Sequence, residues 1–434
     1  MLTAGQIITL DIERPVAGGR MLARHDGRVV FVAGAIPGER VDVRVERVAK
    51  GVAHAETIGV LTPSPDRRPA EDWRCGGRDY AHITYERQCA LKAEVVTDAF
   101  RRLARLPLPT APDVMASPEH GYRLRARLHA SGGRLGFLRE GTHALCDAAA
   151  TGQLSSGTAA WIRHVHQTLA PDVASTIAGV EIAENIPETE RAIHIEARGA
   201  VDRADWSAAG EGLTGLTVQS ESRDAVVLAG MPAVTDRIAV STAADGPVLS
   251  LTRHTTAFFQ ANRFLLPPFV QHVASLTGDG PLLDLYAGVG LFGLAAAALG
   301  RGPVTLVEGD RVSGEGLATN AAAFGQLARV QRRSVEASLD SLARAGTRAS
   351  GAFATCIVDP PRTGLSSEAR AGVVRLAPRR LVYVSCDVAT LARDARVFVD
   401  GGYALVDVRV FDMFPSTAHV ETVALFDRPG PSAP

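Results

Sequence analysis

The C-terminal part of the chain alternates short apolar runs with helical stretches. The runs PLLDLYAG, PVTLVEGD, FATCIVDPP and RRLVYVSC all follow Thr252. Such runs, separated by helices, are typical of βαβ units that build a parallel sheet. Two longer runs, YALVDVRVFDMF and HVETVALFDR, follow with almost nothing between them. They predict an antiparallel hairpin that closes the sheet. We therefore expect an α/β domain over residues 253–434.

The N-terminal region has a different pattern. From Ile7 to about Leu61 the residues alternate in strand fashion, with Gly and Pro turns at AGGR, HDGR and IPGER. This pattern predicts a small β-barrel over residues 1–62. The polar, proline-bearing stretch TPSPDRRPAED follows and is typical of a linker.

The middle of the chain, residues 63–252, has a weaker and mixed pattern. A helix is expected around residues 85–106, and strand-like pieces lie around 121–138 and 191–197. Between them are long connections rich in Ala, Gly and Thr. This pattern predicts a mixed α+β middle domain.

Composition narrows the class of protein. With 434 residues, 46% hydrophobic residues and a formal net charge of −1, the chain is long enough for two or three domains and has no strongly charged tail. Five cysteines without a Cys-x-x-Cys pair suit a reducing cytosol, so we expect no disulfide. The N-terminus lacks a signal pattern, and the longest apolar run, LFGLAAAALG, is too short to span a bilayer. A cytoplasmic protein without membrane contact is predicted.

A glycine-rich turn after the first apolar run indicates a nucleotide-type cofactor. DLYAGVGLFG contains Gly-x-Gly-x-x-Gly at Gly288, Gly290 and Gly293, and Glu308 closes the next run. Taken alone, this motif is compatible with NAD. Asp284, just before the glycines, would be poorly placed beside a pyrophosphate but would favour a ligand with an ammonium and a sulfonium. We therefore predict S-adenosylmethionine, with Glu308 on the ribose hydroxyls.

Three further strand ends carry reactive side chains. Asp359 lies in IVDPPRTG, Cys386 in VSCD and Glu421 in DMFPSTAHVE. Ligands of open α/β sheets bind outside the carboxyl ends of the strands, so these groups are expected to share one crevice. The two prolines after Asp359 stiffen its turn. A buried thiol and a charge on an edge strand are the alternatives for Cys386 and Glu421.

With these motifs in view, the chain resembles a known family. TAFFQAN, DLYAGVG, IVDPPRTGL, VYVSCDVATLARD and DMFPSTAHVETV, in this order, resemble the RNA uracil-C5 methyltransferases that modify transfer and ribosomal RNA. AGGRMLARHDGRVVFVAGAIPGERV resembles the TRAM barrel of many members, an OB-like fold that binds RNA. The resemblance implies a Rossmann-like domain that binds S-adenosylmethionine. It also implies that Cys386 is the nucleophile, that Glu421 is the base, and that Gln260, Tyr286, Glu308 and Asp359 line the cofactor and uracil sites.

The chemistry of uracil methylation requires these residue types. C5 of uracil is a weak nucleophile until a thiolate adds to C6, and Cys386 can form this covalent adduct. Because only the thiolate attacks, we expect the following helix N-terminus to lower the pKa of Cys386. Glu421 would then remove the C5 proton, and Asp359 would orient the edge of the base.

The uracil must leave its stack to reach the thiol. Phe258 is positioned to stack on it, and Gln260 can bind its edge; Phe258 and Phe259 could instead be core residues. Asn320 fits a helix beside the cofactor, and His254 and His419 are expected to serve structure.

Many members of the family bind an iron–sulfur cluster through four cysteines. Here only Cys75 is kept, because Arg78 and Thr151 occupy two ligand positions and another falls near Pro69. Cys146 is close by but would give only two thiols, so we predict no cluster and no other metal. The sequence departs from the family at two further places. Asp387-Val388 stands in place of Asn-Pro, which predicts a looser loop after the nucleophile. Ser334 stands in place of an acid, which predicts weaker cofactor binding. Glu336 could replace the missing acid.

Eight arginines between residues 100 and 139 could bind RNA phosphates, although arginine is frequent throughout the chain. Three other functions remain open: an NAD oxidoreductase, a methyltransferase acting on amino groups, and an RNA-binding or RNA-folding protein without catalysis. The sequence does not separate transfer RNA from ribosomal RNA as the substrate.

Overall fold

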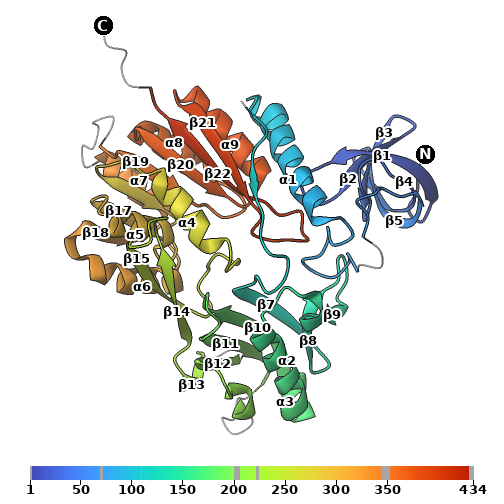
Figure 1. Cartoon of the computed structure of the whole chain (residues 1–434), viewed down its shortest axis with the longest axis horizontal. Helices are drawn as coiled ribbons and strands as arrows, with labels where there is room; N and C mark the ends of the chain where they lie inside the picture. The colour runs from blue at the N-terminus through green and yellow to red at the C-terminus, as the bar shows by residue number, and fades with distance from the viewer. Residues whose placement is uncertain are drawn as a thin grey trace.

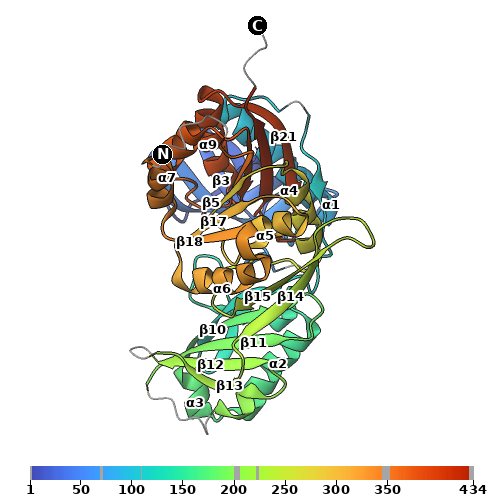
Figure 2. The same cartoon turned by 90° about the vertical axis from the view of Figure 1, so that its left-hand side faces the viewer.

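Three sheet-containing bodies and a connecting helix make up the computed structural model (Figure 1). The structure describes residues 2–68, 72–108, 110–199, 206–220, 224–344 and 352–429. The barrel and the C-terminal domain lie at one end of the molecule, and the middle sheet lies at the other (Figure 2). Within the described residues, no helix is both long enough and apolar enough to cross a bilayer.

The N-terminal strands form a closed barrel in the order β1-β2-β3-β5-β4. Its strands are β1 (Ile7–Pro15), β2 (Met21–His25), β3 (Arg28–Ala33), β4 (Arg40–Ala49) and β5 (Val52–Thr62). Alternate side chains, such as Val30 and Val32 on one strand and Val41 and Val43 on another, are completely buried inside. The alternation in the sequence therefore fixes which face of each strand points inward.

The middle body is a seven-stranded sheet in the order β13-β12-β11-β10-β7-β8-β9. Its strands are β7 (Arg125–Ser131), β8 (Arg134–Leu138), β9 (Leu145–Asp147), β10 (Ile177–Glu184), β11 (Arg191–Ala197), β12 (Gly215–Ser220) and β13 (Val226–Gly230). Helices α2 (Ser156–Thr168) and α3 (Pro171–Thr176) lie on one face, where Trp161 and Ile162 enter the core. The predicted strand-like pieces at 121–138 and 191–197 are confirmed as β7, β8 and β11.

The C-terminal domain contains an eight-stranded sheet in the order β18-β17-β16-β19-β20-β22-β21-β6. Its strands are β6 (Val114–Met115), β16 (Leu282–Leu285), β17 (Val304–Glu308), β18 (Ala328–Arg332), β19 (Thr355–Val358), β20 (Arg380–Ser385), β21 (Ala404–Phe411) and β22 (Glu421–Asp427). Its helices are α4 (Leu266–Ser275), α5 (Leu291–Ala298), α6 (Arg311–Ala321), α7 (Val335–Arg344), α8 (Ser367–Leu376) and α9 (Val388–Asp400).

The pairing within this sheet follows the prediction. The five strands from β18 to β20 are parallel, and β22 adds antiparallel to both β20 and β21. The predicted parallel sheet and closing hairpin are therefore confirmed. The hairpin brings the two ends of the connection between β21 and β22 to the edge where the parallel strands end.

Two elements join the bodies. The ribbon of β14 (Ala233–Ala239) and β15 (Val248–His254) runs from the middle sheet towards the C-terminal domain (Figure 2). Helix α1 (Tyr85–Ala99), continued by the π-helical turn η1 (Phe100–Ala104), lies between the barrel and the C-terminal domain (Figure 1). Val96 and Phe100 of this helix are buried in the core of the C-terminal domain. The predicted boundaries near residues 62 and 252 stay predictions.

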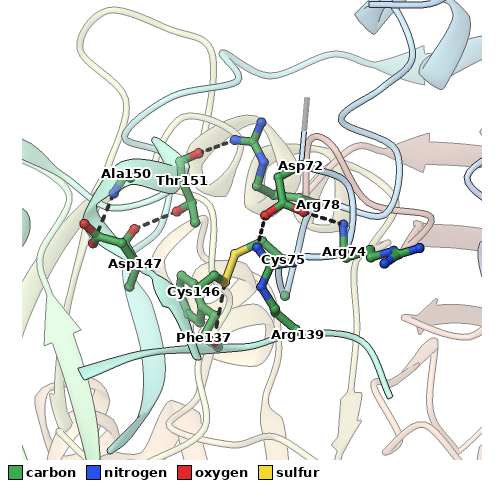
Figure 3. Close-up of a disulfide and its surroundings, with 12 residues drawn as sticks. Asp72, Arg74, Cys75, Arg78, Phe137, Arg139, Cys146, Asp147, Ala150 and Thr151 are labelled. Atoms are coloured by element: carbon green, nitrogen blue, oxygen red, sulfur yellow. Dashed lines mark hydrogen bonds and ion pairs between the residues drawn. A yellow bond between two sulfur atoms is a disulfide. The ribbon is translucent and has the colours of Figure 1, made fainter. Parts of the chain in front are cut away.

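The expectation that the chain has no disulfide is wrong. Cys75 and Cys146 are joined, with their Cα atoms 5.8 Å apart and a sequence separation of 71 (Figure 3). The backbone of Cys75 forms an isolated β-bridge with Arg139, just beyond β8. Cys146 lies in β9 and is paired with Phe137 of β8. The loop before α1 is thereby covalently attached to the middle sheet. Cysteine count and spacing could not show this contact, because it depends on how the loop crosses β8.

Candidate active site

The glycine turn between β16 and α5 forms one half of the site. Tyr286, Gly288 and Gly290 all have positive φ, at 63°, 57° and 101°. A Cβ atom on Gly290 would lie 2.5 Å from a methyl carbon of Leu294, so this position requires glycine. The turn carries the chain from a strand end directly into the N-terminus of a helix. This geometry leaves backbone groups close to any ligand at the sheet edge.

Glu308, the last residue of β17, lies beside this turn. Its carboxylate accepts hydrogen bonds from the backbone N–H groups of Gly288, at 2.8 Å, and Asp310, at 2.6 Å. The side chain is only partly buried. The acid predicted to bind ribose hydroxyls is therefore held in place by the turn and remains accessible.

Asp284 lies in β16, just before the glycine turn. It is fully buried, and its Oδ2 atom accepts a hydrogen bond from the backbone N–H of Gly293 at 2.8 Å. Burial, with smaller contributions from Asp359 and Glu308, raises its pKa to about 8. A Cβ atom on Gly293 would lie 2.7 Å from this carboxylate. Asp284 thus supports the glycine turn from below, and a direct contact with the cofactor stays a prediction.

Asp359 and Gln260 connect the two halves of the site. Asp359 follows β19, which lies next to β16, and its carboxylate accepts a hydrogen bond from Gln260 Nε2 at 3.4 Å. Burial and the nearby charge of Glu308 raise the pKa of Asp359 to about 7, although the hydrogen bond from Gln260 opposes this shift. Two residues 99 positions apart in sequence therefore meet at this edge.

Cys386 and Glu421 lie next to each other across two antiparallel strands. Ser385 of β20 pairs with Thr422 of β22. The next residue outward is Cys386 after β20 and Glu421 at the start of β22. Glu421 is 3% exposed, and burial and Asp359 raise its pKa well above the usual value. The structure thus brings the predicted nucleophile, base and orienting acid together.

The expectation that the thiol has a lowered pKa is wrong for this structure. Burial raises the pKa of Cys386 to about 12, and the negative charges of Glu421 and Asp359 add to the shift. The helix that follows does begin at Val388, but Asp387 caps it by accepting a hydrogen bond from Thr390 N at 2.8 Å. The carboxylates and burial therefore outweigh the helix N-terminus. The Asp387 cap also shows how this loop is fixed without the usual Asn-Pro pair.

Arg362 was not selected from the sequence, although it is near both reactive groups. Its positive charge opposes the raised pKa values of Cys386 and Glu421. The side chain is exposed and follows the two prolines after Asp359. The sequence did contain a signal for this residue, because Arg362 directly follows the stiff Asp-Pro-Pro turn that carries Asp359.

The two neighbouring phenylalanines have different environments. Phe258 is 61% exposed, so the alternative that it is a core residue is wrong. Phe259 is 4% exposed and packs with its ring centroid 4.4 Å from the guanidinium carbon of Arg253. Phe258 is accessible for stacking on a base, and this role stays a prediction.

A cavity of about 350 Å³ borders the nucleophile on the side that faces the barrel. Its lining comes from three parts of the chain: Gly18 to Arg20 of the barrel, Trp73, Cys75, Gly76, Gly77 and Asp79 of the loop that carries the disulfide, and Cys386 to Val388 with Ala418 to Val420 of the C-terminal domain. The thiol is therefore accessible from a space that the barrel helps to enclose.

Other predicted residues have structural contacts. Asn320 bonds the backbone of Thr252 and Val289, each at 3.0 Å, and so fixes the helix beside the glycine turn. His254 Nδ1 lies 2.9 Å from Thr256 Oγ1. Burial raises the pKa of Tyr286, and the charge of Glu336 adds to this shift, which places this acid near the cofactor half.

The exposed Ser334 accepts a hydrogen bond at its Oγ atom from Ala337 N, within its own turn. His419 packs against Phe414, with ring centroids 5.9 Å apart. This contact agrees with the structural role expected of His419. That Glu336 replaces the acid missing at Ser334 stays a prediction.

The arginine-rich segment is divided between separate parts of the molecule. The ion pairs are Arg101 and Arg102 with Asp98, Arg125 and Arg127 with Glu181, and Arg139 with Asp72. Arg123 hydrogen-bonds Gln153, and Arg105 and Arg134 complete the segment. Because most of these cations have acidic partners, the segment is not one continuous basic surface. Contact with RNA phosphates stays a prediction.

The residues at the glycine turn fit S-adenosylmethionine. Burial raises the pKa of Asp284 and that of Asp359, and the nearby charge of Glu308 adds to both shifts, which shows that acidic groups gather at this edge. Such an edge disfavours a pyrophosphate and favours a ligand with positive charge. Within the described ranges, no group of three His, Cys, Asp or Glu side chains could hold a metal ion.

Comparison with known proteins agrees with this geometry. The TRAM domain matches residues 2–58, and the family described as tRNA (Uracil-5-)-methyltransferase matches residues 236–429. A 23S rRNA (uracil(1939)-C(5))-methyltransferase of Pseudomonas putida is 34% identical over 96% of this chain and 93% of that protein. The chain belongs to the RNA uracil-C5 methyltransferase family. An uncharacterized RNA methyltransferase of Thermotoga maritima is 30% identical to this chain, over 95% of the chain and 97% of that protein.

A solved structure shows the same fold. The tRNA (uracil-54, C5)-methyltransferase of Pyrococcus abyssi, in complex with S-adenosyl-L-homocysteine, has a TM-score of 0.75 and 22% identity, covering 96% of this chain and 99% of that one. The predicted fold class and family are confirmed. Membership of this S-adenosylmethionine-dependent family also makes the NAD alternative wrong.

Proposed function

We propose that this methyltransferase acts on a uridine in RNA through a covalent adduct between Cys386 and C6 of uracil. The observation that carries the proposal is the adjacency of Cys386 and Glu421 on paired strand ends, with Asp359 electrostatically coupled to both. A methyltransferase that acts on an amino group needs neither a thiol nor a second acid at this place. S-adenosylmethionine, held at the glycine turn and Glu308, supplies a methyl group on a sulfonium.

The side chains account for each proton and bond in the reaction. Cys386 gives its proton to water, and its sulfur forms a bond to C6 while the electron pair of the C5–C6 double bond moves towards the O4 oxygen. The electron-rich C5 then takes the methyl group as the bond between that group and the sulfonium sulfur breaks, with neutral S-adenosylhomocysteine as the leaving group. Glu421 accepts the C5 proton, the C5–C6 double bond forms again, and the C6–S bond breaks to return the thiolate. The net result is replacement of one hydrogen at C5 by methyl.

Activation of the Cys386 thiol depends on the protonation of the two acids beside it. Without substrate, burial and two carboxylates favour the neutral thiol. A protonated Asp359 or Glu421 removes one of these opposing charges, and both have raised pKa values. We infer that Asp359 is protonated when the uracil binds and donates a hydrogen bond to it. Phe258 stacks on the extruded base, and Gln260, which bonds Asp359, binds its edge.

We propose large-subunit ribosomal RNA as the substrate. Support comes from relatives of nearly full coverage that are named as 23S rRNA uracil-C5 methyltransferases, at 34% and 32% identity. Transfer RNA is the competing substrate, since the Pyrococcus abyssi protein with the same fold acts on it. The two RNAs are to be offered together, so that their rates can be compared directly.

A trapping experiment tests the mechanism. Glu421→Gln is incubated with labelled S-adenosylmethionine and with ribosomal or transfer RNA, and the mixture is run on a denaturing gel. We expect a labelled protein–RNA adduct that is absent from Glu421→Gln/Cys386→Ala, and sequencing of the trapped RNA identifies the uridine. Methylation by the wild-type protein without any adduct in Glu421→Gln would contradict the covalent mechanism. Adducts with transfer RNA alone would overturn the choice of ribosomal RNA.

A further inference from the structure

The loop between β21 and β22, residues 412–420, leads directly into Glu421. Side chains from another part of the chain bind it at every second residue. These contacts are Lys92 with Asp412 and Phe414, Gln88 with Ser416, and Asp79 with Ala418. Asp79, Gln88 and Lys92 belong to the segment that precedes and forms α1, outside the catalytic sheet's own strands.

Lys92 fixes the start of this loop. Its ammonium group pairs with the carboxylate of Asp412 and donates a hydrogen bond to the carbonyl oxygen of Phe414 at 3.2 Å. The Lys92 side chain is 1% exposed and that of Asp412 is 0% exposed. A fully buried pair of opposite charges is costly to separate, so the loop cannot move here without leaving a charge unpaired.

Gln88 fixes the middle of the loop. Its Oε1 atom accepts a hydrogen bond from Ser416 N at 2.9 Å, and its Nε2 donates to the carbonyl oxygens of Tyr80 and Ile83. Tyr80 N in turn donates to the carbonyl oxygen of Ser416 at 2.8 Å. Ser416 has a φ of 62°, a conformation that a serine adopts at a cost and that these bonds hold.

Asp79 fixes the end of the loop, next to the base. Its Oδ2 atom accepts a hydrogen bond from Ala418 N at 2.9 Å. A Cβ atom on Gly19 of the barrel would lie 2.6 Å from the same oxygen, so the barrel packs directly behind Asp79. The disulfide at Cys75 holds the short stretch of chain that leads into this residue.

We propose that Asp79, Gln88 and Lys92 are positioning residues for Glu421. This inference rests on the function proposed above, because it assigns a purpose to the position of the base. Pairing with β20 and β21 fixes the strand that begins at Glu421, and the loop fixes the backbone on the other side. The three side chains therefore set where the carboxylate lies relative to C5 of a bound uracil. None of them touches the reacting atoms.

The test compares Lys92→Met with Glu421→Gln in steady-state and single-turnover reactions with RNA and labelled S-adenosylmethionine. Because a misplacement of about 1 Å can cost about 100-fold, we expect kcat to fall about 100-fold and the protein–RNA adduct to accumulate. KM for RNA and the Kd for S-adenosylhomocysteine should each change less than twofold. Lys92→Met/Glu421→Gln should release RNA no more slowly than Glu421→Gln alone, since both changes act on one step.

A second pair of variants does not leave a buried charge unpaired. Asp79→Ala removes the acceptor for Ala418 N, whereas Asp79→Asn keeps an oxygen in its place. We expect adduct to accumulate in Asp79→Ala and release to be restored in Asp79→Asn. The matched control is Arg87→Met on the same helix, whose partner Glu94 is 45% exposed, and it should release RNA at the wild-type rate.

The outcomes separate this inference from the proposed function. If Glu421→Gln accumulates adduct but Lys92→Met and Asp79→Ala release RNA normally, the positioning role is overturned and the covalent mechanism stands. If Glu421→Gln itself forms no adduct while the wild type methylates RNA, the proposed mechanism fails first. A loss of S-adenosylhomocysteine binding in Asp79→Ala would show a general structural role and also overturn the inference.

Discussion

The two halves of the active site are held in different ways. At the cofactor half, Gly288 N donates a hydrogen bond to Glu308, which is 20 positions away in sequence. Gly293 N donates one to Asp284, which is 9 positions away. At the nucleophile half, the loop before Glu421 is bound by Lys92 and Gln88, which are 320 and 328 positions away from their partners. The first half is local in sequence, and the second depends on contacts between distant parts of the chain.

This difference has a functional consequence. The cofactor half uses one strand–turn–helix unit and its neighbour, so it can form wherever that unit folds. The nucleophile half requires α1, the disulfide loop and the barrel turn to be in place beside the sheet. Changes at the nucleophile half should therefore affect methyl transfer and RNA release while leaving the affinity for the cofactor intact. Changes at the cofactor half should instead weaken cofactor binding.

The largest expected effect is that of removing the thiol. Cys386→Ala should reduce methylation of RNA to background, because the proposed mechanism activates C5 through this thiol, while S-adenosylhomocysteine binds with an unchanged Kd. Rates are measured by transfer of labelled methyl groups and affinity by calorimetry. Cys89→Ala, which removes the partly buried thiol of α1, is the matched control and should retain activity. Residual methylation by Cys386→Ala would show that the reaction does not need this nucleophile.

The disulfide should have the next largest effect, on stability. Closing a loop with a sequence separation of 71 stabilises a fold by about 4 kcal/mol in the chain-entropy view, so Cys146→Ser should lower the free energy of unfolding by up to about that amount. Denaturant titration with and without reductant measures it. Reductant should destabilise the wild type but not Cys75→Ser/Cys146→Ser. An equal response of both proteins to reductant would contradict a stabilising disulfide.

An intermediate effect is expected at the cofactor half. Glu308→Ala removes two hydrogen bonds to a charged acceptor as well as the predicted ribose contact. Since such bonds contribute about 1.5–3 kcal/mol each, the Kd for S-adenosylhomocysteine should rise at least tenfold. Calorimetry provides the measurement. Glu315→Ala on α6, where the side chain is 52% exposed and pairs with surface arginines, should bind normally. Equal affinity in both variants would remove Glu308 from the cofactor site.

The smallest expected effect is a shift in pH dependence. Burial raises the pKa of both Cys386 and Glu421, and the Arg362 cation opposes this rise, so Arg362→Gln should raise both values further. Because the thiolate and the ionised carboxylate are the active forms in the proposed mechanism, the rising part of the profile of kcat/KM against pH should move to higher pH. Arg362→Lys keeps the charge and should leave the profile close to that of the wild type. A shift to lower pH in Arg362→Gln would contradict this electrostatic role.

Local patterns in the sequence were sufficient for the barrel and the parallel sheet, but not for most strands of the middle region. The alternating burial in β1 and the first part of β4 and the apolar runs of β16, β17, β19 and β20 are properties of short segments, and the structure confirms them. The two-residue strand β6 and the half-exposed strand β18 were missed, because neither has a long apolar run. Their place in the sheet depends on the strands beside them.

The sequence by itself determined the order of the elements, the glycine turn and the identity of the reactive side chains. These follow from the periodicity of apolar residues and from the chemistry of Cys386, Asp359 and Glu421. Only the tertiary structure decided that Cys75 meets Cys146, that Asp284 lies beneath the turn, and that the thiol has a raised pKa. Each of these depends on burial or on charges brought together across the sheet, and neither quantity is a property of a single segment of chain.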